Sequence, residues 1–118
     1  MKMNEMENRT DHGLPLAIAD ELNRMEANLA HMDTGVRGYK QLCRSVERMK
    51  TVLQSHGYEL ISLLGQPYTD GMRVMAHFVI DDQMNPNDEP RITSVAKPQV
   101  NYLGRMIQVA QVTVSQPL

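Results

Sequence analysis

The feature that most constrains this chain is a change in the spacing of its apolar residues at Gly57. Before that glycine, apolar residues recur every three or four positions, which is the period of one face of an α-helix. After it, short apolar or alternating stretches end at glycine or proline, which is typical of β-strands and turns. The chain of 118 residues therefore predicts one α+β domain, in which helices precede a sheet.

Two helical segments are predicted between residues 14 and 56. In the first, the apolar residues are spaced by four, three and four positions: Ile18, Leu22, Met25 and Leu29. The second carries a similar series at helical spacing: Tyr39, Leu42, Cys43, Val46, Met49 and Leu53. Gly57 follows the second segment, where glycine commonly ends a helix.

The two segments are expected to fold back on each other. Gly35 and Gly38 separate them, and the first segment is net acidic whereas the second is net basic. An antiparallel hairpin would place these opposite charges side by side. The alternative is one continuous helix of about 40 residues and about 60 Å, because the apolar series stays in register through Val36 and Tyr39.

A helical hairpin with apolar residues on two sides cannot bury both sides by itself. Pairing two hairpins into a four-helix bundle solves this, so residues 14–56 are expected to be the dimerisation region of a homodimer. The expected dimer interface lies on the two apolar series: Ile18, Leu22, Met25, Leu29, Val46, Met49 and Leu53. Residues 1–13 are mostly polar and are expected to form a disordered tail.

Residues 57–118 predict a small antiparallel β-sheet, which we call the wing. Strands are expected at residues 58–64, 73–80, 91–97 and 105–115, with a polar loop at 81–90 and a turn that ends at Gly104. In the last strand, alternate residues form a more apolar face that should pack inward: Met106, Gln108, Ala110, Val112 and Val114.

No pattern in the chain indicates an enzyme. The histidines, His12, His31, His56 and His77, lack the spacing of a metal-binding motif. Cys43 lies on the apolar series of the second helix without a histidine at helical spacing, which indicates a structural thiol. No glycine-rich phosphate-binding loop is present. We therefore expect no catalytic residue, metal, cofactor or small-molecule substrate.

Nucleic-acid and membrane partners are not expected either. The second helical segment is basic, with Arg37, Lys40, Arg44, Arg48 and Lys50. However, the net charge is −2, and only Tyr39 supplies an aromatic ring there, so these residues are interpreted as a solvated face. No apolar run approaches the roughly 18 residues that span a bilayer, and no secretory signal is visible, so a cytoplasmic location is expected.

Two separated motifs resemble those of the GrpE family, the nucleotide exchange factors of DnaK-type chaperones. The first is Gly57-Tyr58-Glu59-Leu60-Ile61, and the second runs from Gly104-Arg105-Met106-Ile107 to Val114. They occur in the family's order and at about its separation, and the similarity spans roughly residues 14–115. About a dozen polar residues precede the first helix, which is typical of a short member without the family's long N-terminal stalk helix.

The resemblance implies a partner surface on the wing. By position, Gly57 joins the wing to the helices and, with Arg105, Met106 and Gln108, would contact the chaperone's nucleotide-binding domain. Gln108 stands where the family carries arginine, and Met72-Arg73-Val74 stand where it carries a His-x-Ala motif. The implied function is ADP release from a DnaK-type chaperone. The alternative is a non-enzymatic dimeric adaptor that keeps the fold but has lost exchange activity.

Overall fold

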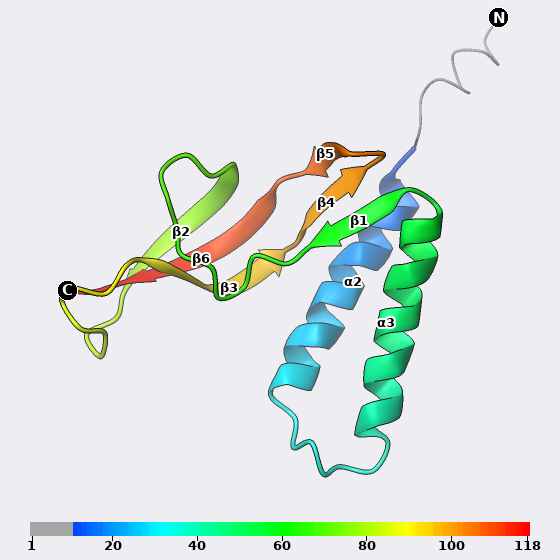
Figure 1. The fold of residues 1–118 in the computed structure, drawn as a ribbon, viewed down its shortest axis with the longest axis horizontal. Helices are drawn as coiled ribbons and strands as arrows, with labels where there is room; N and C mark the ends of the chain where they lie inside the picture. Colours follow the sequence, from blue (N-terminus) through cyan, green and yellow to red (C-terminus); the bar gives the residue numbers. More distant parts are fainter. Residues whose placement is uncertain (1–10) are drawn as a thin grey trace, which may run out of the picture.

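A computed structural model of the protein describes residues 11–118. Its two helices, α2 (Gly13–Ala30) and α3 (Tyr39–Ser55), lie side by side as an antiparallel hairpin (Figure 1). The chain therefore forms the expected hairpin rather than one continuous helix. Gly38 immediately precedes α3 with φ +89°, a backbone conformation that glycine adopts without a steric penalty.

The first ten residues of the expected tail lie outside the described part of the chain. Asp11 accepts a hydrogen bond from the Gly13 backbone N–H at 2.9 Å, and α2 begins at Gly13, one residue before the expected start of the helical region.

Residues 57–118 form six strands in two three-stranded sheets. The first sheet is antiparallel, in the order β1 (Tyr58–Ile61), β4 (Gln99–Tyr102), β5 (Arg105–Gln108). The second has the order β2 (Val74–Ile80), β6 (Ala110–Gln116), β3 (Arg91–Lys97). In this second sheet β3 is antiparallel to β6, but β2 is parallel to it.

The prediction of a single antiparallel sheet is therefore wrong in two respects. The expected strand at 105–115 breaks at Val109, because its two halves pack in different cores: Ile107 contacts the hairpin core, whereas Ala110 belongs to the core of the second sheet. The parallel pairing of β2 with β6 is possible because the segment between Ile80 and Ala110, which contains three other strands, supplies the long crossover that parallel strands need.

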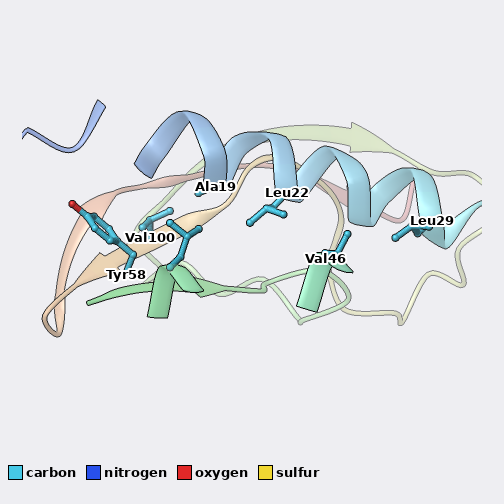
Figure 2. Packing of buried hydrophobic residues seen from close by; sticks show 7 residues of the cluster. Ala19, Leu22, Leu29, Val46, Tyr58 and Val100 are labelled. Atoms are coloured by element: carbon cyan, nitrogen blue, oxygen red, sulfur yellow. The ribbon is translucent and has the colours of Figure 1, made fainter. Parts of the chain in front are cut away.

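The first core joins the hairpin to the first sheet. Its buried members come from both helices, β1 and β4: Ala19, Leu22, Leu29, Val46, Leu53, Tyr58 and Val100 (Figure 2). The second core lies on one face of the second sheet: Leu63, Ile92, Ala110, Val112 and Val114. Burial of the last three confirms the predicted inward face of the final strand, on which Gln108 is half-buried.

Polar contacts also tie the hairpin together and to the sheets. Lys50 Nζ on α3 lies 3.1 Å from Glu26 Oε2 on α2, an ion pair between the basic and the acidic helix. Asn23 Nδ2 on α2 donates a hydrogen bond to the Val95 carbonyl oxygen of β3 at 2.9 Å. Among the residues that the structure describes, no helix is both long enough and apolar enough to cross a membrane.

Candidate functional site: the Gly57 surface

The turn between β4 and β5 lies against the point where α3 leads into β1. The Leu103 backbone N–H donates a hydrogen bond to the Gly57 carbonyl oxygen at 2.9 Å. A Cβ atom added at Gly57 would lie 2.9 Å from Leu103 Cδ2 and 3.2 Å from Tyr102 Cε1. Gly57, the first residue of one sequence motif, therefore lies against Leu103, the residue directly before the other motif. We call the residues at this contact, Gly57, Tyr102, Leu103, Gly104 and Arg105, the Gly57 surface.

The β4–β5 turn has an uncommon backbone for its sequence. Its two central residues have positive φ, +49° at Leu103 and +80° at Gly104, as in a type I′ hairpin turn. Asparagine usually precedes the glycine in such turns, because positive φ is sterically unfavourable for leucine. The Leu103 side chain is nonetheless 74% exposed. Leu103 is thus an exposed apolar residue held in a backbone conformation that is unfavourable for it.

Arg105 supplies charge beside that leucine. It is exposed, and within residues 11–118 its guanidinium takes part in no hydrogen bond or ion pair with another side chain. Its backbone pairs with Tyr102 across the turn, which fixes its place on the surface. The next residue, Met106, is half-buried. The Gly57 surface thus presents one apolar side chain and one cation to the solvent.

Tyr102, which belongs to this surface, packs against two other rings, those of His12 and Tyr58. His12 Nδ1 and Tyr58 Oη are hydrogen-bonded at 2.7 Å. The Tyr102 ring centroid lies 4.7 Å from that of Tyr58 and 4.8 Å from that of His12. These contacts fix the start of α2 to the first sheet. Burial is the main cause that raises the pKa of the Tyr58 phenol, and the nearby Tyr102 and Asp11 raise it further.

The shifted Tyr58 pKa predicts a loss of stability at alkaline pH. A raised pKa means that the folded state favours the neutral phenol, so this contribution is complete below the ordinary tyrosine pKa of about 10 and disappears as pH rises through the higher folded-state value. The melting temperature should fall as the pH rises above about 10, and Tyr58→Phe should flatten that fall. Parallel curves for the two proteins would contradict this prediction.

Gly57 is required both by its backbone conformation and by its neighbours. Gly57 and Gly38 have similar φ, +93° and +89°, but a Cβ atom at Gly38 would meet nothing within 4 Å. Gly38→Ala should therefore cost only the conformational penalty of about 1 kcal/mol. Gly57→Ala should cost more, because it also displaces Leu103 and Tyr102. Urea unfolding of both variants checks this, and equal losses of stability would show that the contact is loose.

Gln108 does not belong to the Gly57 surface, although the resemblance places it among the partner-binding residues. Its Nε2 donates hydrogen bonds to Asp20 Oδ1 at 3.0 Å and to the Pro98 carbonyl oxygen at 2.9 Å. Lys97 Nζ lies 3.9 Å from the other oxygen of the same carboxylate. The Gln108 amide therefore points to α2, where it ties β5 to the hairpin.

The residues expected at a dimer interface divide into two groups. Four are buried within one chain: Leu22, Leu29, Val46 and Leu53. Burial in their own core keeps these four from contacting a second copy, because the hairpin packs on its own sheet. Of the rest, Met25 is half-buried, and Ile18 and Met49 are exposed.

The exposed members border the buried core and extend an apolar band toward the side of the hairpin away from the sheets. On α2, Leu14 lies nine residues, or two and a half turns, from Asn23, which contacts β3. On α3, Lys50 lines a cleft between the hairpin and the two sheets. Val52 lies two residues further along the helix, so its side chain points in nearly the opposite direction. We call this apolar set the outer face: Leu14, Ile18, Leu42, Met49 and Val52.

A cleft of about 360 Å³ lies between the hairpin and the two sheets. Most of its wall is apolar, including Ala27, Leu60, Leu63, Val95 and Pro98. Three of the polar side chains in the wall are engaged: Lys50 pairs with Glu26, and Asn23 donates a hydrogen bond to the Val95 carbonyl oxygen. In the described part of the chain, no group of three or more His, Cys, Asp or Glu side chains is arranged to hold a metal ion.

Comparison with known protein families finds no matching family, and comparison with curated proteins finds no match.

Proposed function

We propose that the protein is a GrpE-like nucleotide exchange factor, which binds the nucleotide-binding domain of a DnaK-type chaperone and promotes ADP release. The observation that carries the proposal is the contact of Gly57 with the β4–β5 turn. The two motifs that resemble the family are far apart in sequence, and Gly57 of the first contacts Leu103, the residue directly before the second. Exposed Leu103 and Arg105 give that surface the apolar and charged groups that a protein partner can recognise.

The proposed mechanism is non-covalent. The Gly57 surface would bind the opened nucleotide-binding domain more tightly than the closed, ADP-bound one, and the difference in binding free energy would open the domain. The coupling is reciprocal: a tenfold weakening of ADP binding by this protein implies a tenfold weakening of its own binding by ADP, about 1.4 kcal/mol. No side chain of this chain needs to perform a chemical step.

Reciprocal coupling gives a direct binding experiment. The protein, immobilised through its N-terminus, should retain a DnaK-type chaperone of the same cell in nucleotide-free buffer and release most of it when ADP is added. Retention that does not respond to ADP would support the adaptor function instead. The position of Gln108 favours that alternative, because its amide is bonded inside the molecule where the family carries a cation.

We also propose a homodimer that forms through the outer face rather than through the buried residues of each hairpin. Two outer faces brought together would build a four-helix bundle and cover apolar side chains such as Leu14 and Val52, which are 73% and 57% exposed in one chain. The helices carry opposite charge, so α2 of one copy placed beside α3 of the other adds electrostatic complementarity.

Val52→Asp should convert the dimer to a monomer without unfolding it. The substitution puts a carboxylate in the proposed interface, but in a single chain that position is open to water. At concentrations low enough for the outer face to be the only contact between copies, light scattering should show the mass falling from two chains to one. Circular dichroism should show that the dissociated chain stays folded at the temperature of the measurement. Thr51→Glu, on the neighbouring exposed residue that points away from the outer face, is the matched control. A monomeric unmodified protein would disprove the dimer.

A further inference from the structure

Strand β2 forms an open edge of the second sheet. The strand order β2-β6-β3 leaves one side of β2 without a neighbouring strand (Figure 1). Its sequence, Val-Met-Ala-His-Phe-Val-Ile, contains no proline, glycine, lysine or acidic residue. Three of its large side chains are exposed, Met75 at 62%, Phe78 at 46% and Ile80 at 57%. Such an edge is a template for another strand, and proteins normally block it with charges, proline or a bulge.

The sequence around this edge is complementary to itself in an antiparallel arrangement. If two copies of β2 pair about a two-fold axis at His77, each residue lies opposite the residue that is equally far from His77 on its other side. The facing pairs are then Arg73 with Asp81, Val74 with Ile80, Met75 with Val79, and Ala76 with Phe78. Every apolar residue meets an apolar residue, and each end carries an opposite-charge pair.

The charged residues at the two ends are available for this pairing. In the described residues Arg73 is exposed and takes part in no ion pair. Asp81 accepts one hydrogen bond, from the Gln83 backbone N–H at 2.9 Å, which leaves its second carboxylate oxygen free for a cation. Arg73 and Asp81 are an even number of residues apart, so their side chains leave the same face of the strand as Met75, His77 and Val79.

We propose that β2 pairs antiparallel with β2 of a second copy of this chain, centred on His77, so that two three-stranded sheets become one continuous six-stranded sheet. This surface lies on the second sheet and does not overlap the outer face of the hairpin. Each interface is two-fold symmetric, so a protein that uses both assembles beyond the dimer. The pairing does not depend on the proposed exchange function.

The charge pairs give a rescue experiment on the full-length protein. Arg73→Glu places two carboxylates opposite each other at both ends, and sedimentation velocity should show the dissociation constant of β2-mediated association rising by about tenfold. The double variant Arg73→Glu, Asp81→Arg restores both pairs and should recover the association of the unmodified protein. The control double variant Arg73→Glu, Asp82→Arg moves the new cation by one residue, which points it to the other face, and should not recover it.

Two outcomes would overturn the proposal. One is a sedimentation profile for Arg73→Glu that matches the unmodified protein over the whole concentration range. The other is equal recovery by the two double variants. All substituted side chains lie at the ends of β2, so the variants should melt as the unmodified protein does. Circular dichroism melts check that each variant is folded.

Cysteine cross-linking tests the register independently. In a Cys43→Ser background, His77→Cys should form a disulfide-linked dimer under mild oxidation, because residue 77 faces its own copy across the axis. Met75→Cys should not, since residue 75 faces residue 79 and lies about four residues, or roughly 13 Å, from its own copy. Equal cross-linking at positions 75 and 77 would exclude this pairing.

Discussion

Leu22→Ala should lower the free energy of unfolding by about 2–5 kcal/mol, a large part of the 5–15 kcal/mol that stabilises a typical domain. Leu22 is 1% exposed and lies between the helices and the first sheet, beside Val46 and Val100 (Figure 2). Truncation removes apolar contacts and leaves a cavity in a core that draws on both helices and two strands. The measurement is urea unfolding followed by circular dichroism.

Ile18→Ala is the matched control for that substitution. Ile18 is one turn earlier on α2 and belongs to the same apolar series in the sequence, but it is 38% exposed on the outer face. Its truncation should cost less than about 1 kcal/mol in the single chain. A Leu22→Ala loss no greater than the Ile18→Ala loss would mean that the hairpin does not pack on its sheet as described.

Arg105→Glu should weaken binding to the chaperone by at least about tenfold, or about 1.4 kcal/mol, while the melting temperature stays within about 1 °C. The reason is that Arg105 is exposed on the Gly57 surface and that its guanidinium takes part in no ion pair within residues 11–118. A reversed charge there opposes the partner surface that the cation faces. Titration of the protein onto an immobilised, nucleotide-free chaperone measures the effect.

Arg37→Glu is the control, because it makes the same charge change in the loop between the helices, at the end of the hairpin far from the β4–β5 turn (Figure 1). It should leave chaperone binding unchanged, apart from a small long-range effect that added salt removes. If Arg37→Glu and Arg105→Glu weaken binding equally, the interaction is a general charge effect and the Gly57 surface is not the binding site.

The helices and most strand positions could be predicted from the sequence, because helical and alternating periods are local properties. Which residues of an apolar series face inward cannot be decided from local spacing. Leu22 and Ile18 belong to one series by spacing, yet the first sheet and α3 cover Leu22 and leave Ile18 exposed. A second apolar stripe therefore looked like part of a dimer interface until the position of the sheet was known.

The first sheet was harder to predict than the helices. Strand β4 follows Pro98 directly and is only four residues long, so its alternation is too short to recognise. Leu103 and Gly104 form a two-residue hairpin turn, but their sequence does not indicate one as asparagine-glycine would. The parallel pairing of β2 with β6 depends on a crossover through three other strands, which no local pattern specifies.

The candidate site was predicted in part. Gly57 and Arg105 were selected through the family resemblance, and the structure brings their segments together. His12 was assigned to the tail, although it bonds Tyr58 across the start of α2. Gln108 was placed on the partner surface because its strand position matched the family motif, but alternation alone does not reveal that Asp20 on α2 and the Pro98 carbonyl engage its amide.

The most direct test of the proposed function is the release rate of a fluorescent ADP analogue from a DnaK-type chaperone of the same cell, measured by stopped flow with excess unlabelled nucleotide. The full-length protein should accelerate release in a concentration-dependent way, and Arg105→Glu should shift the half-maximal concentration upward by about tenfold. A release rate that stays at the spontaneous value for every DnaK-type protein of that cell, at saturating concentrations of this protein, would contradict the exchange-factor function and leave the adaptor in its place.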